Sequence, residues 1–210
     1  NFPFCKWTCY ETGLRSAGIV RWPGKVAVGR VSSELIQYVD VLPTLIEVAG
    51  GRSIEHDFDG RSFKPLLLEE RYESNRFAYG VQTSRGIYSG PEAYGIRSVR
   101  DSRYRLIWNV NAEDEFQNSV TEKLEAYQSW KVLAKKGDDF AKQRFDAYRK
   151  RPEYELYNVV DDPFCMDDLA RSPEARADFK RLKTELANWM ARQGDGGAAT
   201  EAAALTRMPT

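Results

Sequence analysis

Short hydrophobic stretches in the middle and C-terminal parts of the chain, separated by turn-forming residues, are typical of β-strands. Four strands are predicted, over residues 77–82, 94–100, 104–109 and 154–159. The second and third strands are separated by three residues that include Asp101 and Ser102, both of which favour turns. These two strands are therefore expected to form a hairpin.

A helical pattern follows the fourth strand. Residues 172–174, Ser-Pro-Glu, are a typical helix start. The helix they begin has hydrophobic residues along one stripe: Phe179, Leu182, Leu186 and Trp189. Residues 113–150 are charged and are predicted to form a helical insertion between the third and fourth strands. The fold class expected for this part is α+β, with about four antiparallel strands packed against a long C-terminal helix.

The first fifty residues have a different pattern. Residues 17–22 are predicted to form a strand that ends at Pro23-Gly24, and residues 35–39 are short and β-prone. Asp40 has the chemistry of a helix cap, and Gly50 is expected to end the helix. One face of that helix is apolar, with Leu42, Leu45, Ile46 and Ala49. A strand followed by a helix is what the edge of a larger α/β layer would contribute.

These patterns divide the chain into three parts. Residues 1–70 are interpreted as the end of a larger α/β domain, and residues 71–193 as the α+β subdomain. Residues 194–210 are rich in Gly and Ala, have little to bury, and are expected to be disordered.

Charge and cysteine content narrow the function classes. Lys+Arg and Asp+Glu both number 31, so no global basic field argues for nucleic acid. Four arginines near the predicted hairpin are attributed to a solvated sheet face: Arg97, Arg100, Arg103 and Arg105. No apolar run approaches the roughly 20 residues that span a bilayer. The three cysteines fit neither a disulfide framework nor a zinc site, and each is interpreted as a small buried hydrophobe.

The opening segment carries the most specific signal. Residues 6–15, Lys-Trp-Thr-Cys-Tyr-Glu-Thr-Gly-Leu-Arg, follow Phe2-Pro3. This segment resembles the Lys-x-x-x-Tyr-Glu-x-Gly-x-Arg segment of type I sulfatases, the formylglycine-dependent enzymes of the alkaline phosphatase superfamily. In that family it directly follows an Asp-His/Asn-Gly motif that closes the metal site, and that motif would lie before Asn1. The resemblance implies that the chain is the C-terminal portion of a sulfatase.

Further matches to the same family occur in order along the chain. Residues 39–50 are similar to the Val-Asp-Leu-x-Pro-Thr-Leu-Leu…Ala-Gly stretch, and residues 59–67 to Asp-Gly-x-Ser-Leu-x-Pro-Leu-Leu. The hairpin and residues 155–170, with Glu-Leu-Tyr-Asn and Asp-Asp-Pro, resemble the family's ending. Phe2-Pro3 and Tyr79-Gly80-Val81-Gln82 favour the heparan N-sulfatase (sulfamidase) branch, although that branch tends to carry Arg at the position of Lys6.

The resemblance assigns a catalytic-site role to one residue of this chain. Hydrolysis of a sulfate ester needs cationic donors on the sulfuryl oxygens as charge shifts in the transition state. Lys6 would contact the sulfate group beside a divalent metal, usually calcium. A solvated surface lysine is the ordinary alternative, but the motif around Lys6 favours the sulfate role. Glu11 and Arg15, four residues apart, are expected to pair and to hold the loop.

Three other residues are weaker candidates for binding substrate. They are His56, Arg85 and Arg15; for His56 a solvated loop imidazole is favoured, and for Arg15 a structural ion pair. The chain has no Cys/Ser-x-Pro-x-Arg motif for formylglycine and no upstream Asp pair for calcium. No metal ligand or cofactor is therefore expected within it, and the chain alone should be inactive.

The expected function is that of a C-terminal sulfatase portion acting on sulfate esters or N-sulfate groups of sulfated glycans. Its expected partners are a sulfated sugar and the N-terminal sulfatase domain, with no nucleic acid and no membrane span. The family resemblance implies a periplasmic or secreted location. Two alternatives stay open. One is a phosphonate or phosphate ester hydrolase of the same superfamily, and the other is a noncatalytic carbohydrate-binding or assembly module.

Overall fold

The computed structural model describes residues 4–52, 58–83, 94–204 and 206. The chain forms two compact units, one over Ser16–Ala78 and the other over Asn1–Arg15 together with Tyr79–Thr210. Residues 1–15 thus belong to the same unit as residues that lie much later in the chain. The sequence pattern had grouped residues 1–15 with the residues up to 70.

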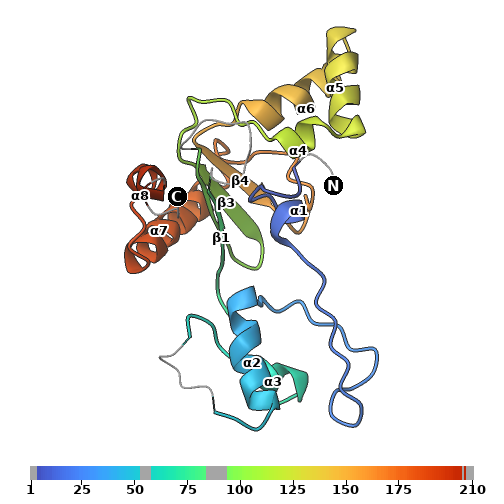
Figure 1. Cartoon of the computed structure of the whole chain (residues 1–210), viewed down its shortest axis with the longest axis vertical. Helices are drawn as coiled ribbons and strands as arrows, with labels where there is room; N and C mark the ends of the chain where they lie inside the picture. Colours follow the sequence, from blue (N-terminus) through green and yellow to red (C-terminus); the bar gives the residue numbers. More distant parts are fainter. Residues whose placement is uncertain (1–3, 53–57, 84–93, 205, 207–210) are drawn as a thin grey trace. The chain divides into compact units, whose positions relative to one another are not determined.

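The larger unit is built on a four-stranded sheet in the order β1-β2-β3-β4 (Figure 1). The strands are β1 (Ala78–Gln82), β2 (Ile96–Arg100), β3 (Tyr104–Asn109) and β4 (Tyr154–Asn158). β2 and β3 are antiparallel with Ser98 opposite Ile107, and β3 and β4 are antiparallel with Leu106 opposite Leu156. The predicted fold class and the hairpin are confirmed.

The predicted C-terminal helix is α7 (Arg176–Arg192), which lies along the sheet in Figure 1. Its buried residues include Leu182, Leu186 and Met190. Two aromatic residues of the predicted stripe pack on strand residues. The Trp189 ring stacks on Tyr79 with centroids 4.6 Å apart, and Phe179 meets Tyr154 edge-on at 5.8 Å. Burial of this stripe explains why residues 176–192 form one continuous helix.

The predicted insertion consists of three helices, α4 (Ser119–Glu122), α5 (Glu125–Lys135) and α6 (Asp139–Arg149). Asn118 caps α4 by accepting hydrogen bonds from two backbone amides, and Asp138 caps α6 through the amide of Ala141 at 2.8 Å. Tyr127 of α5 packs on Phe145 and Tyr148 of α6, with ring centroids 5.3 and 5.5 Å apart. Helices α5 and α6 therefore form a helical hairpin whose aromatic residues Tyr127 and Tyr148 also belong to the hydrophobic core.

The expectation of a disordered tail is wrong for residues 195–204. Helix α8 covers Ala198–Ala204, and the Glu201 carboxylate is buried beside Arg97 Nη2 at 2.8 Å. Asp195 accepts hydrogen bonds from Arg97 as well. Arg97 is only 1% exposed on β2, and a buried guanidinium needs carboxylate partners. The tail is ordered because it neutralises that charge, not because it carries a large apolar face.

The smaller unit contains η1 (Tyr38–Asp40), α2 (Val41–Val48) and α3 (Lys64–Leu67). The strands expected at 17–22 and 35–39 are not formed, and Ile19 is 91% exposed. A strand needs a neighbour for its backbone hydrogen bonds, and none lies beside these segments among the described residues of the unit. The helix prediction is confirmed, but Leu42 and Leu45 on its apolar face are exposed.

Asp40 organises the smaller unit in a way that differs from a simple helix cap. Its carboxylate accepts hydrogen bonds from the backbone amides of Gln37 and Arg61 at 2.8 and 2.9 Å. It also accepts one from Asn75 Nδ2 at 2.9 Å. Thr44 adds a further link by accepting from the Phe63 amide. The carboxylate predicted to cap one helix thus joins three segments of the unit.

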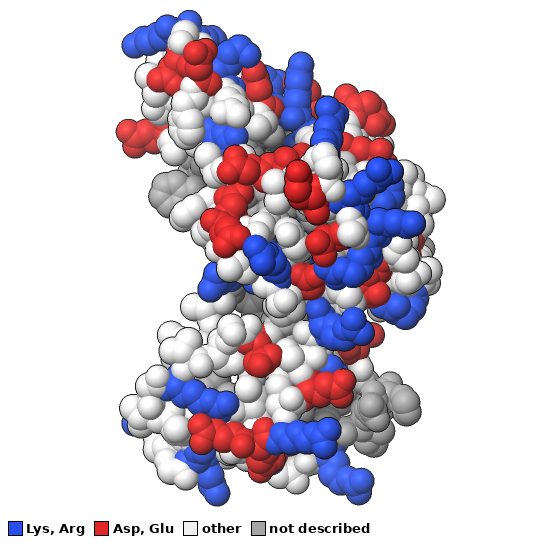
Figure 2. Space-filling view, turned by 180° about the vertical axis from the view of Figure 1, so that it is seen from behind, with Lys and Arg blue, Asp and Glu red and all other residues white. Residues whose placement is uncertain are grey.

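The surface carries both positively and negatively charged side chains. Figure 2 shows Lys and Arg side chains interspersed with Asp and Glu over the face that it displays. Within the described residues, none of the helices is both long and apolar enough to cross a lipid bilayer.

The β2–β3 turn gives a pH-dependent prediction. Asp101 accepts hydrogen bonds from the amides of Arg103 and Tyr104, at 2.8 and 2.7 Å, and from Arg181. Although burial opposes them, these donors hold the pKa of Asp101 below its ordinary 3.8. A lowered carboxyl pKa stabilises the fold above pH 3.8, and this contribution is lost as the pH falls through the folded-state pKa.

We therefore expect Asp101→Asn to lower the free energy of unfolding by about 0.5–1 kcal/mol at pH 7. The difference from the wild type should shrink progressively below pH 3.8. Urea unfolding at pH 7 and pH 3 would measure it, and an equal difference at both pH values would contradict the assignment.

Candidate functional site

The opening loop, residues 4–14, is a compact turn closed by side-chain hydroxyl groups. Thr8 Oγ1 donates hydrogen bonds to the carbonyl oxygens of Phe4 and Cys5, at 3.0 and 2.7 Å. Thr12 Oγ1 donates to the Phe4 carbonyl at 2.7 Å, just inside the short helix α1 (Glu11–Leu14). These bonds tie the start of the loop to its end.

Lys6 lies at the exposed tip of the opening loop. Phe4, two residues before Lys6, and Trp7, directly after it, have φ angles of 63° and 62°, a left-handed conformation that costs energy for residues other than glycine. The Lys6 ammonium lies 4.4 Å from the centroid of the Trp7 ring. No carboxylate of the described residues forms an ion pair with it. The loop therefore presents an available cation on a constrained backbone.

Gly13 is required by close packing inside the opening loop. A Cβ atom at this position would lie 2.5 Å from the Cys5 carbonyl oxygen and 2.6 Å from that of Thr8. Both are backbone atoms, so a side chain could fit only by moving the loop. This accounts physically for the glycine of the Tyr-Glu-x-Gly motif.

Glu11 anchors the opening loop to the sheet. Its carboxylate is buried and forms ion pairs with Arg100 at the end of β2 and with Arg105 on β3, where Arg105 Nη2 lies at 2.9 Å. The two arginines are cross-strand partners, so one carboxylate can form ion pairs with both. The predicted pairing of Glu11 with Arg15 is wrong. Arg15 is exposed after the helix, while the sheet offers Glu11 two guanidinium groups away from water.

Tyr10 provides a second anchor. Its hydroxyl donates to Glu155 Oε2 on β4 at 2.8 Å, and the same oxygen accepts from the Tyr157 hydroxyl at 2.6 Å. Asn109 Nδ2 donates to the other carboxylate oxygen at 2.7 Å. Burial raises the pKa of Glu155, against the lowering effect of Arg151 and these donors. Burial also raises the pKa of Tyr10, which keeps its hydroxyl protonated as a donor.

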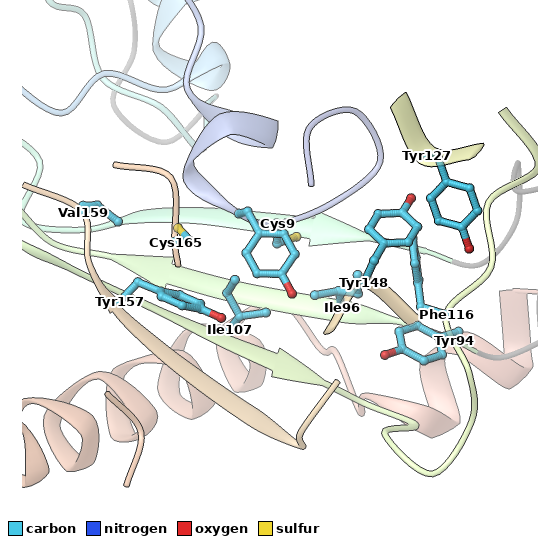
Figure 3. Packing of buried hydrophobic residues seen from close by; sticks show 11 residues of the cluster. Cys9, Tyr94, Ile96, Ile107, Phe116, Tyr127, Tyr148, Tyr157, Val159 and Cys165 are labelled. Atoms are coloured by element: carbon cyan, nitrogen blue, oxygen red, sulfur yellow. The ribbon is translucent and has the colours of Figure 1, made fainter. Parts of the chain in front are cut away.

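An aromatic cluster surrounds these anchors on the sheet face opposite α7 (Figure 3). Arg151 is buried within it, with its guanidinium carbon 3.7 Å from the Phe116 ring centroid and its Nε donating to the Tyr148 carbonyl. Phe4 contacts Tyr10 and Tyr148 edge-on, at 5.0 and 5.3 Å. The loop that carries Lys6 is thus part of the hydrophobic core.

The cysteines Cys9 and Cys165 are buried, which confirms their predicted hydrophobic role. Cys5 is only half-buried, and all three are free thiols.

Arg15 is exposed, and His56 and Arg85 lie outside the described residues. In the part of the chain that the structure describes, no group of three or more His, Cys, Asp or Glu side chains could hold a metal ion. Lys6, the one predicted catalytic residue, lies within the part of the chain that the structure describes.

Sequence reasoning missed the roles of the hairpin arginines. Arg97 and Arg105 are buried and paired with carboxylates, and Arg100 is largely buried. Only Arg103 is solvent-exposed, as predicted for all four. The signal that could have identified the others is their recurrence on strands whose remaining positions are apolar, because a buried strand arginine needs an acidic partner.

Comparison with known proteins agrees with these features. A family profile described as N-sulphoglucosamine sulphohydrolase, C-terminal, matches residues 3–124, more than half of the chain. An ulvan-active sulfatase of Formosa agariphila is 35% identical over 190 residues, which are 90% of this chain and 36% of that protein. Human arylsulfatase A is 33% identical over 104 residues, 48% of this chain and 18% of that protein. The chain spans about a third or less of the length of these relatives.

Solved structures show the same fold. BT4656 in complex with its substrate D-glucosamine-2-N,6-O-disulfate matches 86% of this chain and 29% of that chain, with a TM-score of 0.58 and 18% identity. BT1596, a 2-O GAG sulfatase, matches 74% of this chain and 25% of that chain, with a TM-score of 0.50 and 20% identity. Together with the family profile, these matches show that the chain belongs to the C-terminal N-sulphoglucosamine sulphohydrolase family and is a C-terminal portion of a sulfatase.

Proposed function

We propose that the full-length protein hydrolyses sulfate esters or N-sulfate groups of sulfated glycans, and that this chain contributes Lys6 to its catalytic site. The observation that carries the proposal is the presentation of Lys6. It is exposed at the tip of a loop whose base is fixed to the sheet by Glu11 and Tyr10. A cation held in this way can meet a sulfate group with little reorganisation.

Lys6 would act on the sulfuryl oxygens. Negative charge shifts among these oxygens as the ester bond breaks, and a fixed ammonium lowers the energy of that arrangement. We place the formylglycine nucleophile and the calcium ligands in the preceding part of the protein. There, calcium would supply further positive charge at the sulfate. The residues described here would orient Lys6 and exclude water from the base of its loop.

The substrate class is proposed from the relatives. Two of them are described as active on ulvan, and one similar structure is described with a glucosamine disulfate. These descriptions support a sulfated glycan without naming its linkage. A periplasmic or secreted location is proposed with it, because such a substrate is outside the cytoplasm.

The test is Lys6→Met in the full-length protein, assayed on a sulfated disaccharide. We expect kcat to fall about 10²–10³-fold, because one charged donor to the transition state is lost. Lys6→Arg should retain more activity than Lys6→Met. Lys142→Met, at an exposed position on α6, is the matched control and should leave kcat unchanged. Unchanged kcat in Lys6→Met would overturn the assignment of Lys6.

The competing functions predict different substrate profiles. Faster hydrolysis of a phosphate or phosphonate ester than of the sulfate ester would favour the phosphoryl-transfer alternative. Binding of sulfated sugar without any hydrolysis by the full-length protein would favour the noncatalytic module.

A further inference from the structure

A pocket of about 380 Å³ lies between α6, β4 and the segment 165–168. One of its walls comes from the opening loop, through Phe4 and Tyr10. Arg144 of α6 and Met166 are among the other lining residues. We refer to it as the Arg144 pocket. Its volume is within the range of sites for small ligands.

Arg144 lacks an anionic partner. The residue is 7% exposed, and its Nε has no hydrogen-bond acceptor. Nη1 donates only to the Met166 sulfur, at 3.1 Å, and a thioether is a weak acceptor. The guanidinium carbon lies 6.0 Å from the Phe4 ring centroid. Within the described part of the chain, no carboxylate lies within ion-pair distance of this guanidinium.

Arg144 differs from the other buried arginines in lining a pocket without a carboxylate partner. Arg97 and Arg105 are buried to a similar degree, and each is paired with a carboxylate. Arg151 is enclosed by aromatic rings and does not line the pocket. Taking a guanidinium out of water is costly unless it is paired, so proteins rarely leave one unpaired. An unpaired arginine that lines a pocket is positioned to pair with an anionic ligand.

The remaining lining residues restrict the kind of ligand. The carboxylates of Glu155, Asp167 and Asp168 also line the pocket. Glu155 is occupied by Tyr10 and Tyr157, and Asp168 accepts hydrogen bonds from two backbone amides at 2.9 Å. These acidic groups disfavour a ligand of high negative charge, but a carboxylate such as Asp167 can accept hydrogen bonds from sugar hydroxyl groups.

We propose that the Arg144 pocket binds one anionic sugar residue of a glycan, with Arg144 contacting its sulfate or carboxylate group. This inference rests on the proposed function, because it assigns a second contact with the same substrate class. The loop that presents Lys6 also supplies a wall of the pocket, which links the two contacts structurally. The pocket would therefore recognise the glycan away from the bond that is broken.

Binding can be tested on the 210-residue chain, which supplies all the lining residues of the pocket. Calorimetry would use a defined disaccharide with one sulfate and one uronate, its desulfated and carboxyl-reduced counterpart, and inorganic sulfate. We expect the charged disaccharide to bind at least about tenfold more tightly than either other probe, because only it offers both an anion and sugar hydroxyl groups. Arg144→Gln should weaken this binding about tenfold, while Lys142→Gln on the same helix should not change it.

A measurement on the unsubstituted chain covers the case in which Arg144→Gln fails to fold. The Nε–Hε NMR signal of Arg144, assigned with Arg144→Lys, should shift on titration with the charged disaccharide and not with its neutral counterpart. Equal binding of the neutral disaccharide, or an unmoved Arg144 signal, would overturn the inference. Inorganic sulfate binding as tightly as the disaccharide would overturn the sugar assignment.

The outcomes separate this inference from the proposed function. Loss of turnover in Lys6→Met with no Arg144-dependent binding would overturn only the pocket. Arg144-dependent binding in a full-length protein that leaves sulfate esters intact would overturn only the proposed hydrolysis.

Discussion

Glu11→Gln is expected to lower the free energy of unfolding of this chain by about 3–5 kcal/mol, since it removes one partner of a buried ion-pair cluster. The substitution nearly preserves the shape of the side chain but removes its charge. Arg105 would then remain buried on β3 without a carboxylate, and Arg100 would lose the same partner. Urea unfolding monitored by tryptophan fluorescence would measure the change.

Glu115→Gln is the matched control for this prediction. Glu115 pairs with Arg149, but both side chains are about one-third exposed. Water can replace the lost partner there, so the expected change is below about 1 kcal/mol. A double-mutant cycle between Glu11→Gln and Arg105→Gln should show strong coupling. Equal effects of the two glutamate substitutions, or no coupling in the cycle, would contradict the anchoring role of Glu11.

Glu11→Gln is also expected to affect catalysis. Glu11 fixes the base of the loop that presents Lys6, and small displacements of a catalytic group reduce rates strongly. In the full-length protein, Glu11→Gln should therefore lower kcat even at a temperature where the variant is fully folded. Glu115→Gln should not.

The second large effect is expected from the double variant Asp195→Asn, Glu201→Gln. Both carboxylates contact the buried guanidinium of Arg97, so their joint removal leaves that charge without an ionised partner in the tail. We expect a loss of about 3–5 kcal/mol in the free energy of unfolding. Chemical denaturation of the 210-residue chain would measure it. Proteolysis should also reach residues 195–204 more readily.

Two further variants test whether the unpaired charge of Arg97 causes this loss of stability. Asp178→Asn removes a partly exposed ion pair with Arg181 on α7 and should cost below about 1 kcal/mol. Adding Arg97→Met to the double variant should restore part of the lost stability, because no buried charge is then left unpaired. If Arg97→Met brings no recovery, the tail is ordered by its other contacts, such as the approach of Gly197 to the Trp108 ring.

Local sequence patterns were sufficient to predict the hairpin and the long C-terminal helix. The hairpin was predictable because Asp101 satisfies the turn amides within three residues of itself. The long helix α7 was predictable because its apolar stripe has the helical period. By contrast, the predicted strand at 17–22 has β-prone residues but no neighbour to bond with in the described unit, so propensity alone misled.

The chain's own sequence determined its family, its α+β class and the identity of Lys6 as the residue at the sulfatase motif, because motif order and periodicity are properties of the linear chain. Only the tertiary structure decided which charges pair. Glu11 meets Arg100 and Arg105 at separations of 89 and 94 residues, while its expected partner Arg15 lies four residues away in solvent. Ion pairs are selected by burial, since desolvated charges must be neutralised wherever the fold places them. For the same reason, the ordered tail beside Arg97 and the unpaired Arg144 became visible only in three dimensions.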